Sequence, residues 1–197
     1  MRKKSHISLA QYIVNSLNDE GLKKHKLSFY IGSILPDIKP SFVYKRHEIN
    51  GTYGALQRNI VRLTEGNKLI QKKKKGRKYY MDLGQISHYL ADYFTFPHND
   101  IYPGTLKEHC SYEEMLKHDL RAYIKSGAAA RQEKVNVEFL NAEHICEFVW
   151  KAHKDYLETK HSVENDIHHI IEINHRAVEG MIELLTKQRK EYAVLQA

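Results

Sequence analysis

Apolar residues recur every three to four positions along most of this chain, which is the spacing that lines one face of an α-helix. The first such segment places Leu9, Ile13, Val14 and Leu17 on a single stripe. Turn-forming residues are scarce, with 4 prolines and 10 glycines, and no segment alternates apolar and polar residues as a half-buried strand does. The pattern therefore predicts an all-α protein.

The breaks between the apolar stripes divide the chain into about seven expected helices. Ser5 and Ser162 are expected N-caps, because a serine hydroxyl at that position accepts a hydrogen bond from the first turn. Pro36 is expected to end the second helix. The expected helices span about 5–17, 21–34, 51–64, 80–94, 106–124, 137–158 and 163–191. No internal repeat is visible, so the 197 residues are predicted to form a single-domain bundle.

Histidines and carboxylates interrupt the apolar pattern near the middle of the chain. Two pairs have the spacing His-x₃-carboxylate, His88 with Asp92 and His109 with Glu113, and His98 lies between them in an expected loop. Residues four apart share a helix face, with about 5–6 Å between Cβ atoms, so each pair can hold one cation. Nitrogen and oxygen ligands without thiolate suit zinc, manganese or iron in a catalytic site. Two such pairs with a histidine between them suggest a multinuclear metal site.

Three further candidate ligands lie upstream of these pairs. His6 is on the first expected helix, Asp37 follows the break at Pro36, and His47 comes ten residues later. In chain order the whole candidate set is His6, Asp37, His47, His88, Asp92, His98, His109 and Glu113.

This ordered set resembles the zinc-dependent phospholipase C family, whose all-α fold is shared with the P1-type nucleases. The resemblance covers about residues 5–115, and it is carried by His47 and by the motifs SHISLA, GSILPD, HYLAD, FPHN and EHCSYE. It implies two zinc ions and a position for a third. The implied ligands are Asp37, His47, His88 and Asp92 for the first, His98, His109 and Glu113 for the second, and His6, the shared Asp92 and the N-terminal amine for the third.

The activity implied by the resemblance is hydrolysis of phosphodiesters, which in phospholipases releases diacylglycerol and a phosphorylated head group. Closely spaced divalent ions lower the pKa of a bound water, so that hydroxide can attack phosphorus, and they stabilise the charge of the transition state. Asp37, a carboxylate on a loop beside the metals, is the expected catalytic residue, because it can orient the attacking water or accept its proton. The substrate stays open between a phospholipid and another phosphodiester.

The third metal position is expected to be weak or empty. Its amine ligand would be that of Met1, which has to fold back past Arg2, Lys3 and Lys4. Three positive side chains near a divalent cation oppose this placement electrostatically. The positions built on His88 and His109 are expected to be filled.

Three alternatives remain beside the phospholipase-like function. A P1-type single-strand nuclease would use the same ligands. The dipeptide His118-Asp119 raises an HD-type metal phosphohydrolase, which would need further ligands such as His98 and Asp166, although no flanking motif supports them. In a non-catalytic protein the metals would be structural, and Lys68–Lys78 would bind nucleic acid or an anionic membrane. An open, oxygen-rich ligand set argues against a purely structural metal.

Charge and cysteine content add limited information. The net charge of +7 is concentrated in Lys68–Lys78, which we expect to be a solvated loop with at most weak contact to anionic surfaces. Two cysteines do not form a disulfide framework, which indicates a reducing compartment. The basic start is not followed by the apolar core of a signal peptide, and no run approaches the roughly 20 apolar residues of a membrane span. We therefore expect a cytoplasmic location, and the sequence does not indicate an oligomeric state.

Overall fold

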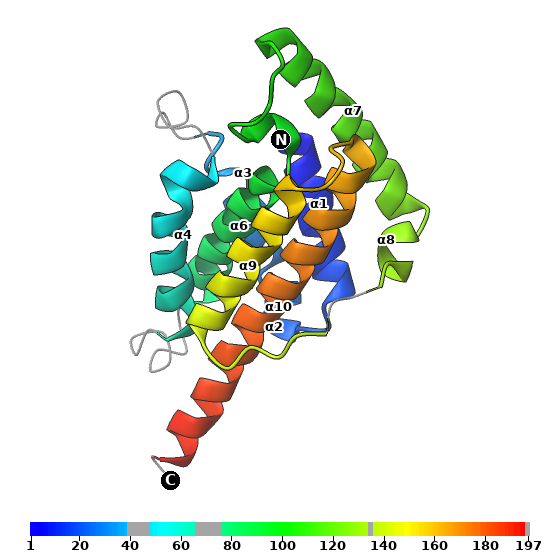
Figure 1. The fold of residues 1–197 in the computed structure, drawn as a ribbon. Helices are drawn as coiled ribbons and strands as arrows, with labels where there is room; N and C mark the ends of the chain where they lie inside the picture. Colours follow the sequence, from blue (N-terminus) through cyan, green and yellow to red (C-terminus); the bar gives the residue numbers. More distant parts are fainter. Residues whose placement is uncertain (39–47, 66–75, 134–135, 196–197) are drawn as a thin grey trace.

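The computed structural model describes residues 1–38, 48–65, 76–133 and 136–195, and every regular element in these ranges is helical. The prediction of an all-α protein is confirmed. Figure 1 shows the helices packed side by side, with the last turns of the C-terminal helix extending beyond the others. The elements are α1 (Lys3–Ser16), α2 (Glu20–Lys24), α3 (Lys26–Ile34), α4 (Ile49–Thr64), α6 (Gly76–Tyr93), the short 3-10 helix η2 (Phe96–His98), α7 (Leu106–Lys125), α8 (Ala128–Arg131), α9 (Ala142–Leu157) and α10 (Val163–Val194).

The described ranges contain nine α-helices where about seven were expected. The helix expected at 21–34 is divided at His25, whose backbone leaves the helical region (φ −108°, ψ 22°) while its ring stacks on Tyr80 with centroids 5.3 Å apart. The stretch between the helices expected at 106–124 and 137–158 contains the short helix α8. Ser162 caps α10 as predicted, accepting a hydrogen bond from the Asn165 amide, whereas Ser5 lies inside α1. The division at His25 and the four-residue α8 account for the two additional helices.

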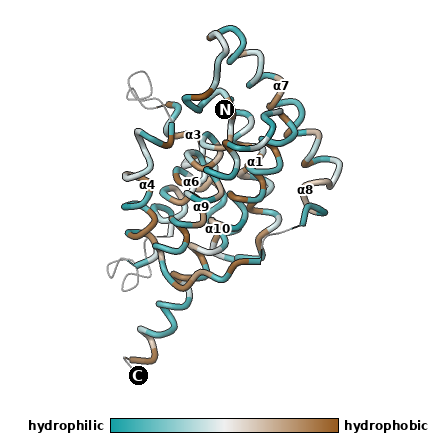
Figure 2. The backbone as a smooth tube through the Cα atoms, in the orientation of Figure 1, coloured by the Kyte–Doolittle hydropathy of each residue, from teal (hydrophilic) through white to brown (hydrophobic). Residues whose placement is uncertain are grey.

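Helix α6 lies at the centre of the bundle and contacts α1, α3, α4 and α10. Its apolar residues Leu83, Ile86 and Leu90 are almost fully buried, and each such side chain contributes about 1.5–3 kcal/mol to folding. Most helices carry both hydrophobic and hydrophilic stretches (Figure 2), as expected of helices with one face on a shared core. The position of α6 in the core also buries its polar residues near the C-terminal end.

Helices α3 and α6 approach each other closely because each has a glycine at the contact. A Cβ atom at Gly32 would lie 2.0 Å from the Met81 carbonyl oxygen, and one at Gly84 would lie 2.2 Å from that of Phe29. A larger residue at either position would force the helices apart. The close approach brings the Ser33 carbonyl oxygen within 2.9 Å of His88 Nδ1.

Two of the sequence predictions concern residues outside the described ranges. The candidate ligand His47 lies outside them, and so does most of the lysine-rich segment Lys68–Lys78. Lys78 itself belongs to α6, where its Nζ lies 2.9 Å from Asp82 Oδ2. None of the helices in the described ranges has the length and apolar character needed to cross a membrane. The role of the lysine segment and the cytoplasmic location stay predictions.

Candidate metal centre

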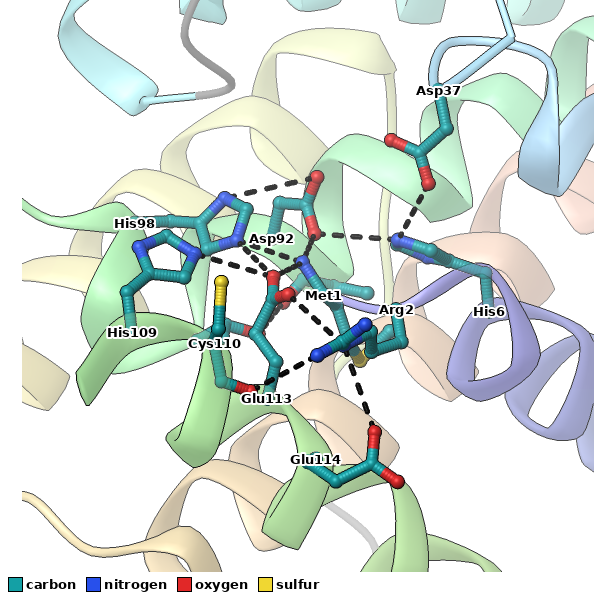
Figure 3. Close-up of polar contacts among 12 residues, drawn as sticks. Met1, Arg2, His6, Asp37, Asp92, His98, His109, Cys110, Glu113 and Glu114 are labelled. Carbon is teal, nitrogen blue, oxygen red and sulfur yellow. Dashed lines mark hydrogen bonds and ion pairs between the residues drawn. The ribbon is translucent and has the colours of Figure 1, made fainter. Parts of the chain in front are cut away.

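Six of the candidate ligands form two compact groups, and Figure 3 labels all of them except His88. They come from the start of α1, the turn that follows α3, the C-terminal half of α6, η2 and α7. Within each group the ligand atoms lie within 4.8 Å of one another. The first group is His6, Asp37 and His88, and the second is His98, His109 and Glu113.

The first group pairs two buried imidazoles with the carboxylate of Asp37. His88 Nε2 lies 3.6 Å from Asp37 Oδ1, and His6 Nε2 lies 4.0 Å from Asp37 Oδ2. The His6 and His88 rings stack with centroids 3.9 Å apart. Burial, and then the neighbouring His88, lowers the pKa of His6 to about 3, so its ring is neutral at pH 7. A neutral imidazole is the form that binds a metal ion.

Asp92 lies between the two groups and is fully buried. Its Oδ2 is 3.1 Å from His88 Nε2 and 4.0 Å from His98 Nδ1, while its Oδ1 is 3.4 Å from His6 Nε2. Burial raises the pKa of Asp92, but the Met1 ammonium and His98 outweigh burial and hold that pKa well below its usual range. Asp92 is therefore an ionised carboxylate whose Oδ2 lies between the two groups and whose Oδ1 faces His6.

The second group is built around Glu113 on α7. Glu113 Oε1 lies 3.0 Å from His98 Nε2 and 3.3 Å from His109 Nε2. Burial raises the pKa of Glu113, but hydrogen bonds from His109 and His98 outweigh it and lower that pKa below its usual range. Burial, followed by the Met1 ammonium, lowers the pKa of His98. The side chain of His109 is 28% exposed, so this group is open to solvent on its side.

The amine of Met1 lies inside the site, which corrects the expectation that nearby positive side chains would keep it away. Its nitrogen is 2.8 Å from Asp92 Oδ1, 2.9 Å from Glu113 Oε1 and 2.7 Å from His98 Nε2. The two carboxylates outweigh the effect of burial and raise the pKa of the amine. Arg2 is exposed, and its side chain donates to the Cys110 carbonyl oxygen on α7 instead of repelling the amine. The premise that Arg2, Lys3 and Lys4 would keep the amine out of the site was therefore wrong. The prediction that the third metal position, at His6, is weak or empty stays a prediction.

The residues present fit a zinc site on three observations. Both ring nitrogens of His6 are buried without a hydrogen-bond partner in the part of the chain that the structure describes. The Met1 ammonium already places one positive charge between Asp92 and Glu113. His88 Nδ1 contacts the Ser33 carbonyl oxygen, which leaves Nε2 facing the site, as is usual for metal-binding histidines.

The HD dipeptide lies away from both groups. His118 and Asp119 are exposed on α7, and His118 Nε2 contacts Glu114 Oε1 at 3.1 Å. Asp166, the other residue that this alternative needs, accepts hydrogen bonds from two tyrosines and a backbone amide. The geometry does not assemble an HD-type site from these residues.

A family model described as zinc-dependent phospholipase C matches residues 5–163 of the chain. The chain belongs to this family. The candidate ligands from His6 to Glu113 all lie inside the segment that matches the zinc-dependent phospholipase C model, and most of α10 lies beyond it. The resemblance drawn from the sequence motifs is thereby confirmed. A comparison with curated proteins found no match, and neither did a comparison with solved structures.

We expect a chain extended by Gly-Ser before Met1 to bind zinc about ten-fold more weakly or worse, which is the scale of effect seen when contacts around a metal are lost. An amide nitrogen carries no charge and is a poor ligand, and the added residues have to enter the space between Asp92, His98 and Glu113. Calorimetric titration with zinc measures the difference. The same two residues added after Ala197 provide the control, and equal affinity of both proteins would contradict a role for the amine.

Proposed function

We propose that this chain is a zinc-dependent hydrolase that cleaves a phospholipid or a related phosphodiester. The observation that carries the proposal is the pair of histidine–carboxylate groups joined by Asp92, in a chain that belongs to the zinc-dependent phospholipase C family. We further propose that residues 1–197 act as a single domain. The family match supports the class of reaction, and the choice of a phospholipid or related phosphodiester as the substrate is part of our proposal.

The proposed ligand sets follow the family resemblance, and they differ from the grouping in space at His6, which lies with Asp37 and His88. The contacts of Asp92 with both groups support its role as a shared ligand, and the position of the Met1 amine supports a third, amine-containing position. His47 enters only through the family resemblance, because it lies outside the described residues. The sets are Asp37, His47, His88 and Asp92 for the first zinc, His98, His109 and Glu113 for the second, and His6, Asp92 and the Met1 amine for the third.

When bound at such a site, zinc lowers the pKa of water towards neutrality and stabilises negative charge on phosphate oxygens. The residues of this chain bind and orient the reactants. Asp37 stands at the edge of the first group with its side chain 8% exposed, where it can orient a water and accept its proton. The more exposed His109 marks the side on which a phosphate can enter. Water attacks phosphorus directly, so no covalent intermediate with the protein is required.

A parallel assay with four substrates tests the proposed function. The substrates are a chromogenic phosphodiester, a short-chain phosphatidylcholine, single-stranded DNA and a chromogenic phosphomonoester. We expect hydrolysis of the diester and the phospholipid that a chelator abolishes and added zinc restores. Faster cleavage of DNA would assign the chain to the P1-type branch, and turnover of the monoester alone would favour an HD-type enzyme. Bound zinc without any turnover would favour a non-catalytic, anion-binding protein.

A further inference from the structure

A buried carboxylate outside both metal-binding groups joins three separate elements. Asp166 lies in the first turn of α10, beyond the family match, and it is fully buried. Its Oδ2 accepts hydrogen bonds from the Phe96 amide at 2.8 Å and from the Tyr112 hydroxyl at 2.9 Å. Its Oδ1 accepts one from the Tyr156 hydroxyl on α9 at 2.8 Å. All of these donors lie on elements other than α10.

Two of the donors belong to residues that lie within two positions of a candidate ligand of the second group in the sequence. Phe96 opens η2 and comes two residues before His98, and Tyr112 immediately precedes Glu113 on α7. Because both donors bind the same oxygen of Asp166, that atom fixes the separation between η2 and α7. The separation of these elements sets the 3.0 Å contact between His98 Nε2 and Glu113 Oε1.

A second anchor holds the other side of His98. The Asn99 side chain donates from Nδ2 to the carbonyl oxygens of Tyr93 and Thr95, at 3.2 and 3.1 Å. Its Oδ1 lies 2.8 Å from Nε2 of the buried His153 on α9. The segment that presents His98 is thus fixed from α10 on one side and from α9 on the other.

Folding stability alone does not account for an aspartate at this position. Burial raises the pKa of Asp166 to about 6, in spite of the hydrogen bonds that it accepts. A carboxyl group whose pKa is higher in the folded chain than in the unfolded chain contributes less stability as the pH rises from about 4 to 6. The ionised carboxylate at neutral pH therefore weakens folding while it supplies the acceptors that η2 and α7 share.

We propose that Asp166 is a positioning residue for the zinc position built on His98, His109 and Glu113. It acts by tying η2 to α7, and this inference rests on the proposed zinc-dependent function. Its hydrogen bonds lead to η2, α7 and α9, and none of them leads to the elements that carry His6, Asp37 and His88. Loss of these bonds should therefore weaken one zinc position and spare the other.

The first test is Tyr112→Phe, which removes one hydroxyl and leaves the ring in place. We expect zinc affinity at the second group to fall about ten-fold or more, the scale seen for outer contacts of metal ligands. Tyr53→Phe is the matched control, because the Tyr53 hydroxyl likewise donates a hydrogen bond that joins two helices, here from α4 to the Cys146 carbonyl oxygen on α9. Calorimetric titration of the metal-free proteins should give wild-type affinity for this control.

A double-mutant cycle separates positioning from general destabilisation. In a His109→Ala background, which lacks the second group, Tyr112→Phe should have no further effect on zinc binding. In a His88→Ala background its effect should persist in full. Loss of affinity at both groups alike would overturn the proposal, because it would indicate a purely structural role.

Substitution of Asp166 itself completes the test. Asp166→Leu removes every acceptor and should weaken the second zinc position at least as much as Tyr112→Phe. Asp166→Asn keeps one carbonyl oxygen for Phe96 and Tyr112 and should largely restore binding. If Asp166→Leu does not fold by circular dichroism, Tyr112→Phe decides the question alone. Unchanged zinc affinity in Tyr112→Phe would overturn the proposal, whereas a wild-type protein that binds no zinc would overturn the proposed function and the positioning role with it.

Discussion

Asp92→Asn is expected to remove most of the bound zinc and to lower phosphodiester hydrolysis by about a thousandfold or more, equal to about 4 kcal/mol of transition-state stabilisation. The expected loss is this large because Asp92 contacts both groups, with His88 at 3.1 Å, His6 at 3.4 Å and His98 at 4.0 Å. An asparagine keeps the shape of the side chain, but it carries no charge and offers one oxygen where the carboxylate offers two.

The matched control for this substitution is Asp82→Asn on the same helix. Asp82 is also buried, and it pairs with Lys78 and Arg62 instead of a candidate ligand. It lies ten residues before Asp92, which is about 15 Å along the helix axis. Elemental analysis and hydrolysis rates of both variants should show wild-type values for Asp82→Asn only. Full zinc content in folded Asp92→Asn would contradict a shared ligand role.

Asp37→Asn is expected to lower the rate by about 10²- to 10⁴-fold, the range that a general base contributes, while zinc content is largely retained. Asparagine still presents an oxygen towards His88 and His6, which lie 3.6 and 4.0 Å from the Asp37 carboxylate. It cannot accept a proton from water at neutral pH. The chemical step should therefore suffer more than metal binding.

Measurement of kcat and zinc content on the same sample separates these two effects. Asp100→Asn is a suitable control, because Asp100 is an exposed carboxylate outside both groups and accepts a hydrogen bond from Asn50. It should leave both quantities unchanged. A loss of zinc in proportion to the loss of rate in Asp37→Asn would mean that Asp37 serves only as a ligand.

Local spacing predicted the features of this site that depend on one helix. The four-residue spacing brings His88 Nε2 within 3.1 Å of Asp92 Oδ2 and His109 Nε2 within 3.3 Å of Glu113 Oε1, as expected for residues on one helix face. The apolar periodicity gave the all-α class and most of the helices. The roles of these side chains as zinc ligands stay a proposal.

Contacts between distant segments could not be predicted in the same way. The charges of its neighbours in sequence oppose the placement of the Met1 amine in the site, whereas Asp92 and Glu113, which attract it, come from α6 and α7. The bond from the Phe96 amide to Asp166 joins residues 70 positions apart, and no spacing rule brings them together. Such contacts depend on how the helices pack, which local periodicity does not determine.

The zinc content of the purified, untagged protein tests the proposed metal centre most directly. Elemental analysis should find two or more zinc ions per chain, because two separate groups of ligands converge in the structure. A metal-free protein that is fully folded, and that gains neither stability nor hydrolytic activity when zinc is added, would contradict the proposed zinc-dependent function.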